Sequence, residues 1–402
     1  MAAALAARRR PGPPQELVEA HNAHGRFALR RRVFARDHLH GTWRLEEVEG
    51  VRGADAARLA RDPELSPVDW TRALYLDIET TGLSGGAGTI PFLVAMGVFE
   101  EEGFVLYQGF LRGPEEEAAM LADVADRVAN AQALVSFFGK SFDRHRLEDK
   151  MRVHGIRAPF AERPHWDLYH PLRRLYEGAF RDGRLGTMER ELCGVQRVDD
   201  LSGRFAPEAW FDFLADRAHL LEDVFRHNED DVLSLVVLAA HLGCALREVR
   251  GDETPLDGPA DVRAVGLARL FHEGPSGEGC AEVLRWAREA RERGAGNLRE
   301  LGWLEGQALR RMGQHEQAAA CFSQLVAEER TAVDGHAFQA WVALAKHHEH
   351  RTRSLRDARD CVRAAERLAR TRVAVSAGAR RDLERRALRL DEKLAAAGDE
   401  SA

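Results

Sequence analysis

The segment that most constrains the fold is Leu74–Leu83, a short apolar run carrying two carboxylates two positions apart, Asp77 and Glu79. Side chains alternate between the faces of a β-strand, so residues i and i+2 point the same way. Both carboxylates can therefore reach one cation, and carboxylate oxygen is a ligand that Mg²⁺ and Mn²⁺ prefer. The alternative is a strand end closed by salt bridges, but no basic residue occurs in the next dozen positions.

Two further acids lie downstream of this strand. Asp143 follows an apolar run and the turn residue Gly139, close to an expected helix start, although an aspartate there can also serve only as a helix cap. Asp231 lies four residues after His227 in a helical segment, so the two side chains share a face. That face offers a carboxylate ligand and an imidazole to position or deprotonate a water. Four such acids suggest a two-metal phosphodiesterase site.

The order of apolar segments around these acids predicts an α/β domain with a mixed sheet. Strands are expected at 74–78, 92–99, 104–111, 133–137 and 165–168. Helices are expected at 114–130 and 142–154, and helices then predominate up to residue 246. Three strands followed by helix, strand, helix and short strand is the order of a ribonuclease-H-like fold, with helices on both faces of the sheet.

The same pattern divides the chain into five parts. We expect residues 1–13, rich in Ala, Arg, Pro and Gly, to be disordered, and residues 14–70 to form an N-terminal extension without an assignable role. The ribonuclease-H-like domain is expected at 71–248, followed by a linker at 249–260 that contains Pro, Gly and Asp. The remainder, 261–396, is predicted to be entirely helical.

The helical part carries a weak internal repeat. Gly306, Ala318 and Phe322 lie at spacings typical of a tetratricopeptide-like helix pair, and Ala281, Ala318 and Ala358 occupy matching positions 37 and 40 residues apart. A plain helical bundle is the alternative. Stacked helix pairs usually present a concave groove, so a protein partner on this helical tail is expected.

Charge and cysteine content restrict the kind of protein. The net charge is −7, yet residues 1–45 hold nine arginines against three acids, and residues 351–393 hold fourteen basic against seven acidic residues. An acidic centre between basic ends suits a metal enzyme that meets a polyanion, although these ends can equally be solvated arginine-rich helix faces. The five cysteines form no CxxC pair, and no apolar run is long enough to span a bilayer. We expect a cytoplasmic protein without a membrane partner.

The motifs together resemble those of a known nuclease family. Asp77–Leu83 resembles its first exonuclease motif, Phe138–Asp143 its second and His227–Asp231 its third. Ser84–Thr89 resembles a glycine-rich extension, and His165–Leu175 resembles an intermediate segment. In this order the motifs are similar to the YprB-type ribonuclease-H-like domain, a branch of the DEDD 3′–5′ exonuclease superfamily.

The resemblance implies an activity and a set of roles. The protein would hydrolyse single-stranded DNA or RNA from the 3′ end with two divalent ions, Mg²⁺ or Mn²⁺. The implied metal ligands are Asp77, Glu79, Asp143 and Asp231. His227 would act on the attacking water, and Thr80 and Leu83 would contact the terminal nucleotide. Asp167 would support the site from behind, or only cap a strand or helix.

The sequence departs from the family pattern at two positions. The second motif often carries Asn before its glycine, where this chain has Phe138. The third motif has His227 four residues before Asp231, the spacing usual in the tyrosine variant of the superfamily, whereas the histidine variant uses five. This spacing supports the metal role of Asp231 more directly than the water-positioning role of His227, and Asp230 is the alternative ligand.

Two other classes of function stay open at this stage. A binding module would hold nucleic acid without cutting it. The loss of one of the four acids would favour such a module, but all four are present. A scaffold would recruit a partner through the helical tail, and this role is compatible with an enzyme. The choice between DNA and RNA depends on a contact with the 2′-hydroxyl that no motif identifies.

Overall fold

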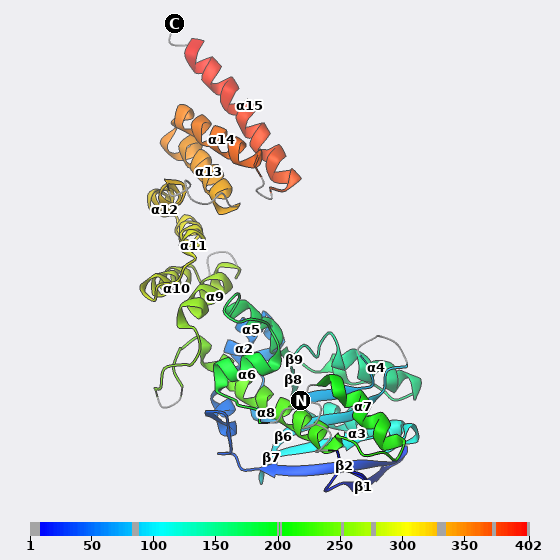
Figure 1. The fold of residues 1–402 in the computed structure, drawn as a ribbon. Helices are drawn as coiled ribbons and strands as arrows, with labels where there is room; N and C mark the ends of the chain where they lie inside the picture. The colour runs from blue at the N-terminus through cyan, green and yellow to red at the C-terminus, as the bar shows by residue number, and fades with distance from the viewer. Residues whose placement is uncertain are drawn as a thin grey trace. The chain divides into compact units, whose positions relative to one another are not determined.

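The computed structural model describes residues 9–82, 88–198, 201, 203–250, 253–274, 279–327, 335–371 and 375–399, without the side chains of 397–399. The chain divides into two units, Met1–Gly258 and Pro259–Ala402 (Figure 1). The boundary falls within the segment predicted to be a linker. Among the described residues, none of the helices combines the length and apolar character needed to cross a membrane.

A mixed seven-stranded sheet forms the centre of the first unit. Its strands, in spatial order, are β1 (Val18–Asn22), β2 (Gly25–Phe34), β7 (Gly103–Phe110), β6 (Pro91–Glu100), β5 (Ala73–Thr80), β8 (Ala133–Ser136) and β9 (His165–Asp167). Neighbours from β1 to β5 are antiparallel, whereas β5, β8 and β9 are parallel. This arrangement confirms the predicted mixed sheet.

The region predicted as an N-terminal extension, residues 14–70, contributes the strands β1 and β2 to this sheet. β2 pairs with β7 over seven residue pairs, from Ala28 with Phe110 to Phe34 with Phe104. The sequence obscured this strand because Arg30–Arg32 interrupt its apolar pattern. Arg30 is nevertheless buried, with its guanidinium 4.2 Å from the ring centre of Phe225 and hydrogen bonds to the Gln15 carbonyl.

The rest of this N-terminal region packs against the helix at residues 221–245. It comprises the two-stranded sheet of β3 (Leu39–His40) and β4 (Trp43–Arg44), the helix α2 (Gly53–Ala60), and the 3₁₀ segments Leu45–Gly50, Pro63–Leu65 and Trp70–Arg72. Trp43, Leu45 and Val48 have no solvent exposure. The unit therefore begins well before residue 71.

Residues 9–13 differ from the disorder that their composition predicted, while 1–8 lie outside the described residues. The backbones of Arg10 and His219 exchange two hydrogen bonds of 2.9 Å. The Arg9 guanidinium donates to Asp212 Oδ2 over 2.5 Å. Pairing with distant groups thus fixes a segment that has no structure-forming pattern of its own.

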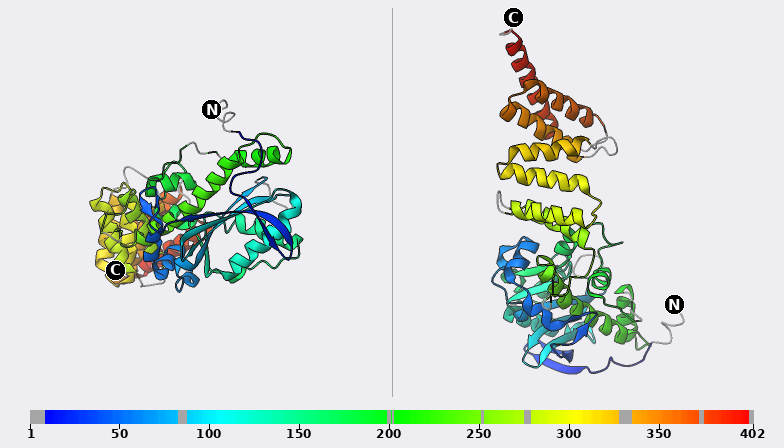
Figure 2. Two further views of the ribbon diagram at one scale, coloured as in Figure 1. Left: turned by 90° about the horizontal axis from the view of Figure 1, so that it is seen from below. Right: turned by 90° about the vertical axis from the view of Figure 1, so that its left-hand side faces the viewer.

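Helices cover both faces of the sheet, as predicted (Figure 2). α3 (Glu117–Asn130) packs against one face, and the long α8 (Leu221–Ala245) packs against β5 and β6 on the other. Alternate residues of β5 separate accordingly: Leu74, Leu76 and Ile78 join the apolar core shared with α3, whereas Asp77 points towards α8. The other helices of this unit are α4 (Asp143–Val153), α5 (Tyr169–Leu175), α6 (Leu185–Cys193) and α7 (Ala206–Leu214), with 3₁₀ segments at Pro114–Glu116, Phe160–Glu162 and Gly203–Phe205.

A glycine on β6 allows α8 to approach the sheet closely. A Cβ atom at Gly97 would lie 2.8 Å from Val232 Cγ1 and 2.2 Å from Phe104 Cζ. Any larger residue there would push the helix from the strand that carries Asp77 and Glu79.

The second unit consists of helices that pack on their sequence neighbours. They are α9 (Ala260–His272), α10 (Cys280–Glu292), α11 (Leu298–Arg311), α12 (His315–Ala327), α13 (Gly335–His347), α14 (Leu355–Ala369) and α15 (Ala377–Asp399), with a π-helical segment at His348–Thr352. Each helix contacts the next, and α11 also contacts α9 and α13. This packing agrees with the predicted helical domain.

The repeat positions are confirmed only in part. A Cβ atom at Gly306 would lie 2.3 Å from the Phe322 ring, so this glycine permits close packing of α11 on α12. Ala318 and Ala358 are buried, each at the fourth residue of its helix. Ala281, however, is exposed, and Val283 holds the corresponding buried position in α10. The alanine spacing therefore gave the wrong register for the first pair, and the tetratricopeptide assignment stays a prediction.

Candidate active site

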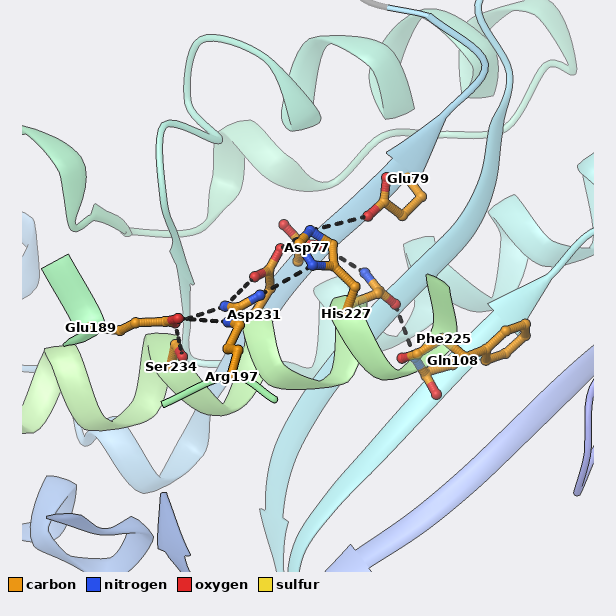
Figure 3. A network of polar contacts seen from close by, with 10 residues as sticks. Asp77, Glu79, Gln108, Glu189, Arg197, Phe225, His227, Asp231 and Ser234 are labelled. Atoms are coloured by element: carbon orange, nitrogen blue, oxygen red, sulfur yellow. Dashed lines mark hydrogen bonds and ion pairs between the residues drawn. The ribbon is translucent and has the colours of Figure 1, made fainter. Parts of the chain in front are cut away.

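Asp77 lies on β5 with its carboxylate held by an amide chain from two other elements. Asn228 Nδ2 of α8 donates to Asp77 Oδ2 over 2.7 Å. Gln108 Nε2 of β7 donates in turn to Asn228 Oδ1 over 3.0 Å and to the Phe225 carbonyl over 2.8 Å (Figure 3). Asn228 and Gln108 have no solvent exposure. These contacts fix the orientation of Asp77 relative to α8.

Glu79, His227 and Asp231 form a group that could hold a metal ion, because their ligand atoms all lie within 4.8 Å of one another. His227 Nε2 is 4.0 Å from Glu79 Oε1 and 3.6 Å from Asp231 Oδ2 (Figure 3). The predicted i, i+4 pair of α8 thus faces β5. Asp77, Asp143 and Asp230 lie outside this group of three.

Asp143 is the first residue of α4 and is 7% exposed. The absence of a side chain at Gly139 makes room for it, since a Cβ atom there would lie 2.9 Å from Asp143 Oδ2. Burial, together with the negative charges of Asp167 and Asp231, raises the pKa of Asp143 to about 8. Its carboxylate therefore lies within the electrostatic range of the third motif.

The four acids repel one another in the absence of a cation. Burial raises the pKa of Asp77 well above its ordinary range, and the charges of Asp231, Asp143 and Glu79 raise it further. The hydrogen bond from Asn228 acts in the opposite direction but is a smaller influence. A divalent cation would favour the ionised carboxylates, and carboxylate oxygens are the ligands that Mg²⁺ and Mn²⁺ prefer. The donor set therefore fits a divalent metal.

An arginine that sequence reasoning missed contacts the third motif. Arg197 Nη2 donates to Asp231 Oδ1 over 2.6 Å, and Arg197 Nη1 lies 3.2 Å from His227 Nδ1. Glu189 of α6 holds the same guanidinium through contacts of 2.6 and 2.7 Å (Figure 3). Burial lowers the pKa of Arg197, but Asp231 and Glu189 together raise it to a greater extent. No local sequence pattern predicts that Arg197 contacts the site, because it precedes Asp231 by 34 positions.

The bracket formed by Arg197 and Glu189 extends back to the N-terminal region. Glu189 accepts a hydrogen bond from Ser234 Oγ of α8, and Ser234 Oγ lies 2.8 Å from His40 Nε2. His40 belongs to β3. The N-terminal region, to which the sequence assigned no role, therefore contacts the residues that hold Arg197. The side chains of Arg197 and Glu189 are 8% and 2% exposed, which restricts their movement.

Asp167 shapes the turn that leads to Asp143. Its Oδ1 accepts hydrogen bonds from the backbone N–H groups of Phe138 (2.8 Å) and Tyr169 (3.1 Å), and its Oδ2 accepts one from Lys140 (3.1 Å). Asp167 therefore fixes the backbone of this turn, while its support of the site stays a prediction.

The two predicted substrate contacts have different outcomes. Thr80 is buried, and its hydroxyl donates to the Gly82 carbonyl over 2.9 Å, so its side chain is committed to the backbone. Leu83 and most of the glycine-rich segment that follows lie outside the described residues.

Comparisons with known proteins bear on this same region. Residues 74–243 match the RNase_H superfamily. The match runs from β5 into α8 and includes all five predicted catalytic residues. The chain is also 33% identical over 220 residues to the "Uncharacterized protein YprB" of Bacillus subtilis (strain 168), with 54% of this chain and 53% of that protein aligned. The chain thus spans about half the length of this relative. These similarities confirm the ribonuclease-H-like prediction and support a nuclease-type activity.

Proposed function

We propose that the first unit is a metal-dependent 3′–5′ exonuclease that hydrolyses phosphodiester bonds of single-stranded DNA or RNA. The observation that carries this proposal is the convergence of acids from β5, α4 and α8: Glu79 and Asp231 lie with His227 so that their ligand atoms are within 4.8 Å of one another, and the charges of Asp231, Asp143 and Glu79 all act on Asp77. Such a group is unfavourable without a cation and suits a two-metal site.

Four acids would bind the metal ions, and neighbouring residues hold two of these acids in position. Asp77, Glu79, Asp143 and Asp231 would hold two Mg²⁺ or Mn²⁺ ions. When bound, such ions supply a water of lowered pKa and stabilise charge on the attacking and leaving oxygens. Asn228 keeps Asp77 aimed at the site through its 2.7 Å hydrogen bond. The fourth ligand, Asp143, keeps its place because Gly139 leaves room for it.

His227 is better suited to orient water than to deprotonate it. An arginine is always a donor, so Nδ1 of His227, 3.2 Å from Arg197 Nη1, must be the acceptor in this hydrogen bond. The proton of the neutral ring is then on Nε2, which faces Glu79 and Asp231. From there Nε2 can donate a hydrogen bond to a water or a phosphate oxygen.

Digestion of 5′-labelled single strands in Mn²⁺ tests the proposal. We expect wild type to give a ladder shortened from the 3′ end, and we expect Asp77→Asn to lose it. Asp126→Asn, an exposed carboxylate of α3, is the matched control and should keep the ladder. Parallel DNA and RNA strands identify the preferred sugar. A folded wild type that binds Mn²⁺ and cleaves neither strand would overturn the proposal.

The second unit favours an additional role as a recruiting surface. A groove of about 520 Å³ between α13 and α15 is lined by four basic residues, Lys346, Arg385, Arg386 and Arg389, against one acidic residue, Asp382, together with apolar residues such as Val342. We propose that it takes an acidic peptide of a partner protein. Anisotropy of a labelled Glu- and Leu-rich peptide on the full chain should show binding that Lys346→Glu abolishes. Equal binding by that variant would exclude the groove.

A further inference from the structure

Phe138 combines two unusual properties beside the proposed site. Its backbone is in the left-handed region, with φ of 62°, a conformation that glycine adopts readily but that strains a bulky residue. Its ring is also 44% exposed to solvent, although aromatic side chains of this size are mostly buried. Neither property benefits the fold, so the residue points to a function.

The surrounding structure holds this conformation firmly. Asp167 accepts hydrogen bonds from the N–H groups of Phe138 and Lys140, on either side of Gly139. The rings of Phe138 and Tyr169 pack edge to face, with centroids 5.0 Å apart and planes at 71°. Tyr169 is supported in the same way by Phe137, at 5.5 Å and 84°. A ring held by this edge-to-face contact keeps its orientation while part of its surface stays open.

Phe138 belongs to the turn that leads to the proposed metal ligand Asp143. Gly139 follows Phe138 directly, and the Cβ position of Gly139 lies 2.9 Å from Asp143 Oδ2. His170 lies 6.4 Å from the ring between ring centroids, and Lys140, two residues further along the chain, is 38% exposed and pairs over 3.4 Å with Asp62, which is itself 25% exposed. A base and the phosphate beside it need such a combination of an aromatic surface and a positive charge.

We propose that Phe138 is a stacking platform for a base at the 3′ end of the single-stranded substrate. The inference rests on the proposed function. It adds that the strand end is held by stacking on the aromatic face of its base. Every base has such a face, so binding of this kind does not depend on sequence. Stacking of this kind favours unpaired strands, because the bases of a duplex are already stacked on one another.

Binding measured without cleavage tests the platform. Anisotropy of a labelled ten-nucleotide strand, in Ca²⁺ on the full chain, should show roughly tenfold weaker binding by Phe138→Asn and near wild-type binding by Phe138→Trp. Asparagine tolerates the left-handed backbone, so Phe138→Asn should melt at the same temperature as wild type or higher. Phe211→Asn, another exposed phenylalanine of the unit, is the matched control and should bind as wild type does.

A strand with an abasic site makes the test specific to stacking. Removing the base at the 3′ end or at the position before it should weaken wild-type binding roughly tenfold at one of these positions. The same removal should cost Phe138→Asn much less, since the partner ring is absent. If wild type cleaves single strands but Phe138→Asn binds them equally well, the platform is refuted and the nuclease stands. If wild type neither binds nor cleaves, the proposed function itself fails.

Discussion

Both units bury a carboxylate, and they surround it differently. Asp143 in the first unit and Glu349 in the second are 7% and 5% exposed. Glu349 accepts hydrogen bonds from Arg386, Arg389 and Lys393, with 2.9 Å to Arg389 and 3.0 Å to Lys393. Among the described residues, neither lysine nor arginine forms a salt bridge with Asp143.

This difference appears directly in the acidity of the two groups. The hydrogen bond from Arg389, helped by Lys393 and Arg386, lowers the pKa of Glu349 to about 2. Burial raises the pKa of Asp143 to about 8. Glu349 is neutralised by three cations, whereas Asp143, within the described part of the chain, lies buried beside other acids without one, a combination typical of functional sites. The comparison therefore separates an acid that serves stability from one available for function.

The largest expected contrast is in catalysis. Asp143→Asn should lower the rate of strand digestion in Mn²⁺ by at least about 10³-fold, since a ligand that stabilises transition-state charge is worth several kcal/mol. Glu349→Gln should leave the rate per folded molecule unchanged. Initial rates at saturating strand concentration measure both. Equal losses would mean that the two acids do not differ in role.

For stability in the absence of metal, Glu349→Gln should have the larger effect and Asp143→Asn the smaller one. Glu349→Gln leaves three cations without their partner and should lower the free energy of unfolding of the second unit by about 2 kcal/mol, less than for a fully buried pair because Arg389 and Lys393 are partly exposed. Asp143→Asn should cost little or be stabilising. Urea denaturation in EDTA checks this, with the exposed Glu384→Gln as control. A destabilised Asp143→Asn and a neutral Glu349→Gln would break the comparison.

Arg197 sharpens the comparison, because it brings one cation into the acidic site. If its bracket with Glu189 positions Asp231 and His227, Arg197→Met should weaken Mn²⁺ binding about 10- to 100-fold, as is usual for groups that orient ligands. Arg197→Lys, which keeps the charge but loses the fork, should not restore it. Calorimetric titration with Mn²⁺ measures this, with Arg30→Met as a control at another buried arginine. Tighter Mn²⁺ binding by Arg197→Met would show that this arginine only opposes the metal.

The smallest effect expected is an opposite dependence of stability on pH. The pKa of Asp143 is raised from 3.8 to about 8, so its contribution is complete below pH 4 and is lost as the pH rises to 8. The pKa of Glu349 is lowered from 4.5 to about 2, so its contribution is present above pH 4.5 and is lost as the pH falls through 2. In EDTA, wild type should lose at least about 1 kcal/mol relative to Asp143→Asn between pH 5 and 8.5. Parallel stability curves for the two proteins would contradict the raised pKa.

Local patterns anticipated much of the site. The alternation along β5 put Asp77 and Glu79 on one face, and the spacing of four in α8 put His227 beside Asp231, because strand and helix periodicity are properties of the local backbone. The predicted strands and helices of residues 73–246 agree with the structure to within a few residues.

Contacts between distant segments could not be anticipated in this way. The arginine-rich strand β2 acquires its place only by pairing with β7, and the repeat register in α10 depends on which residue meets the neighbouring helix. The sequence has no basic residue close after Glu79, yet Arg197, from a distant segment of the chain, contacts the site through Asp231.

The sequence by itself determined where the acids are and which of them share an element, since periodicity and turn residues act over a few positions. Only the tertiary structure decided the surroundings of each acid: three cations for Glu349, one for Asp231, an amide for Asp77 and a tight turn for Asp143. Those surroundings set the pKa values, because burial and charge depend on neighbours in space. An identical carboxylate is therefore a structural link in one unit and a candidate metal ligand in the other.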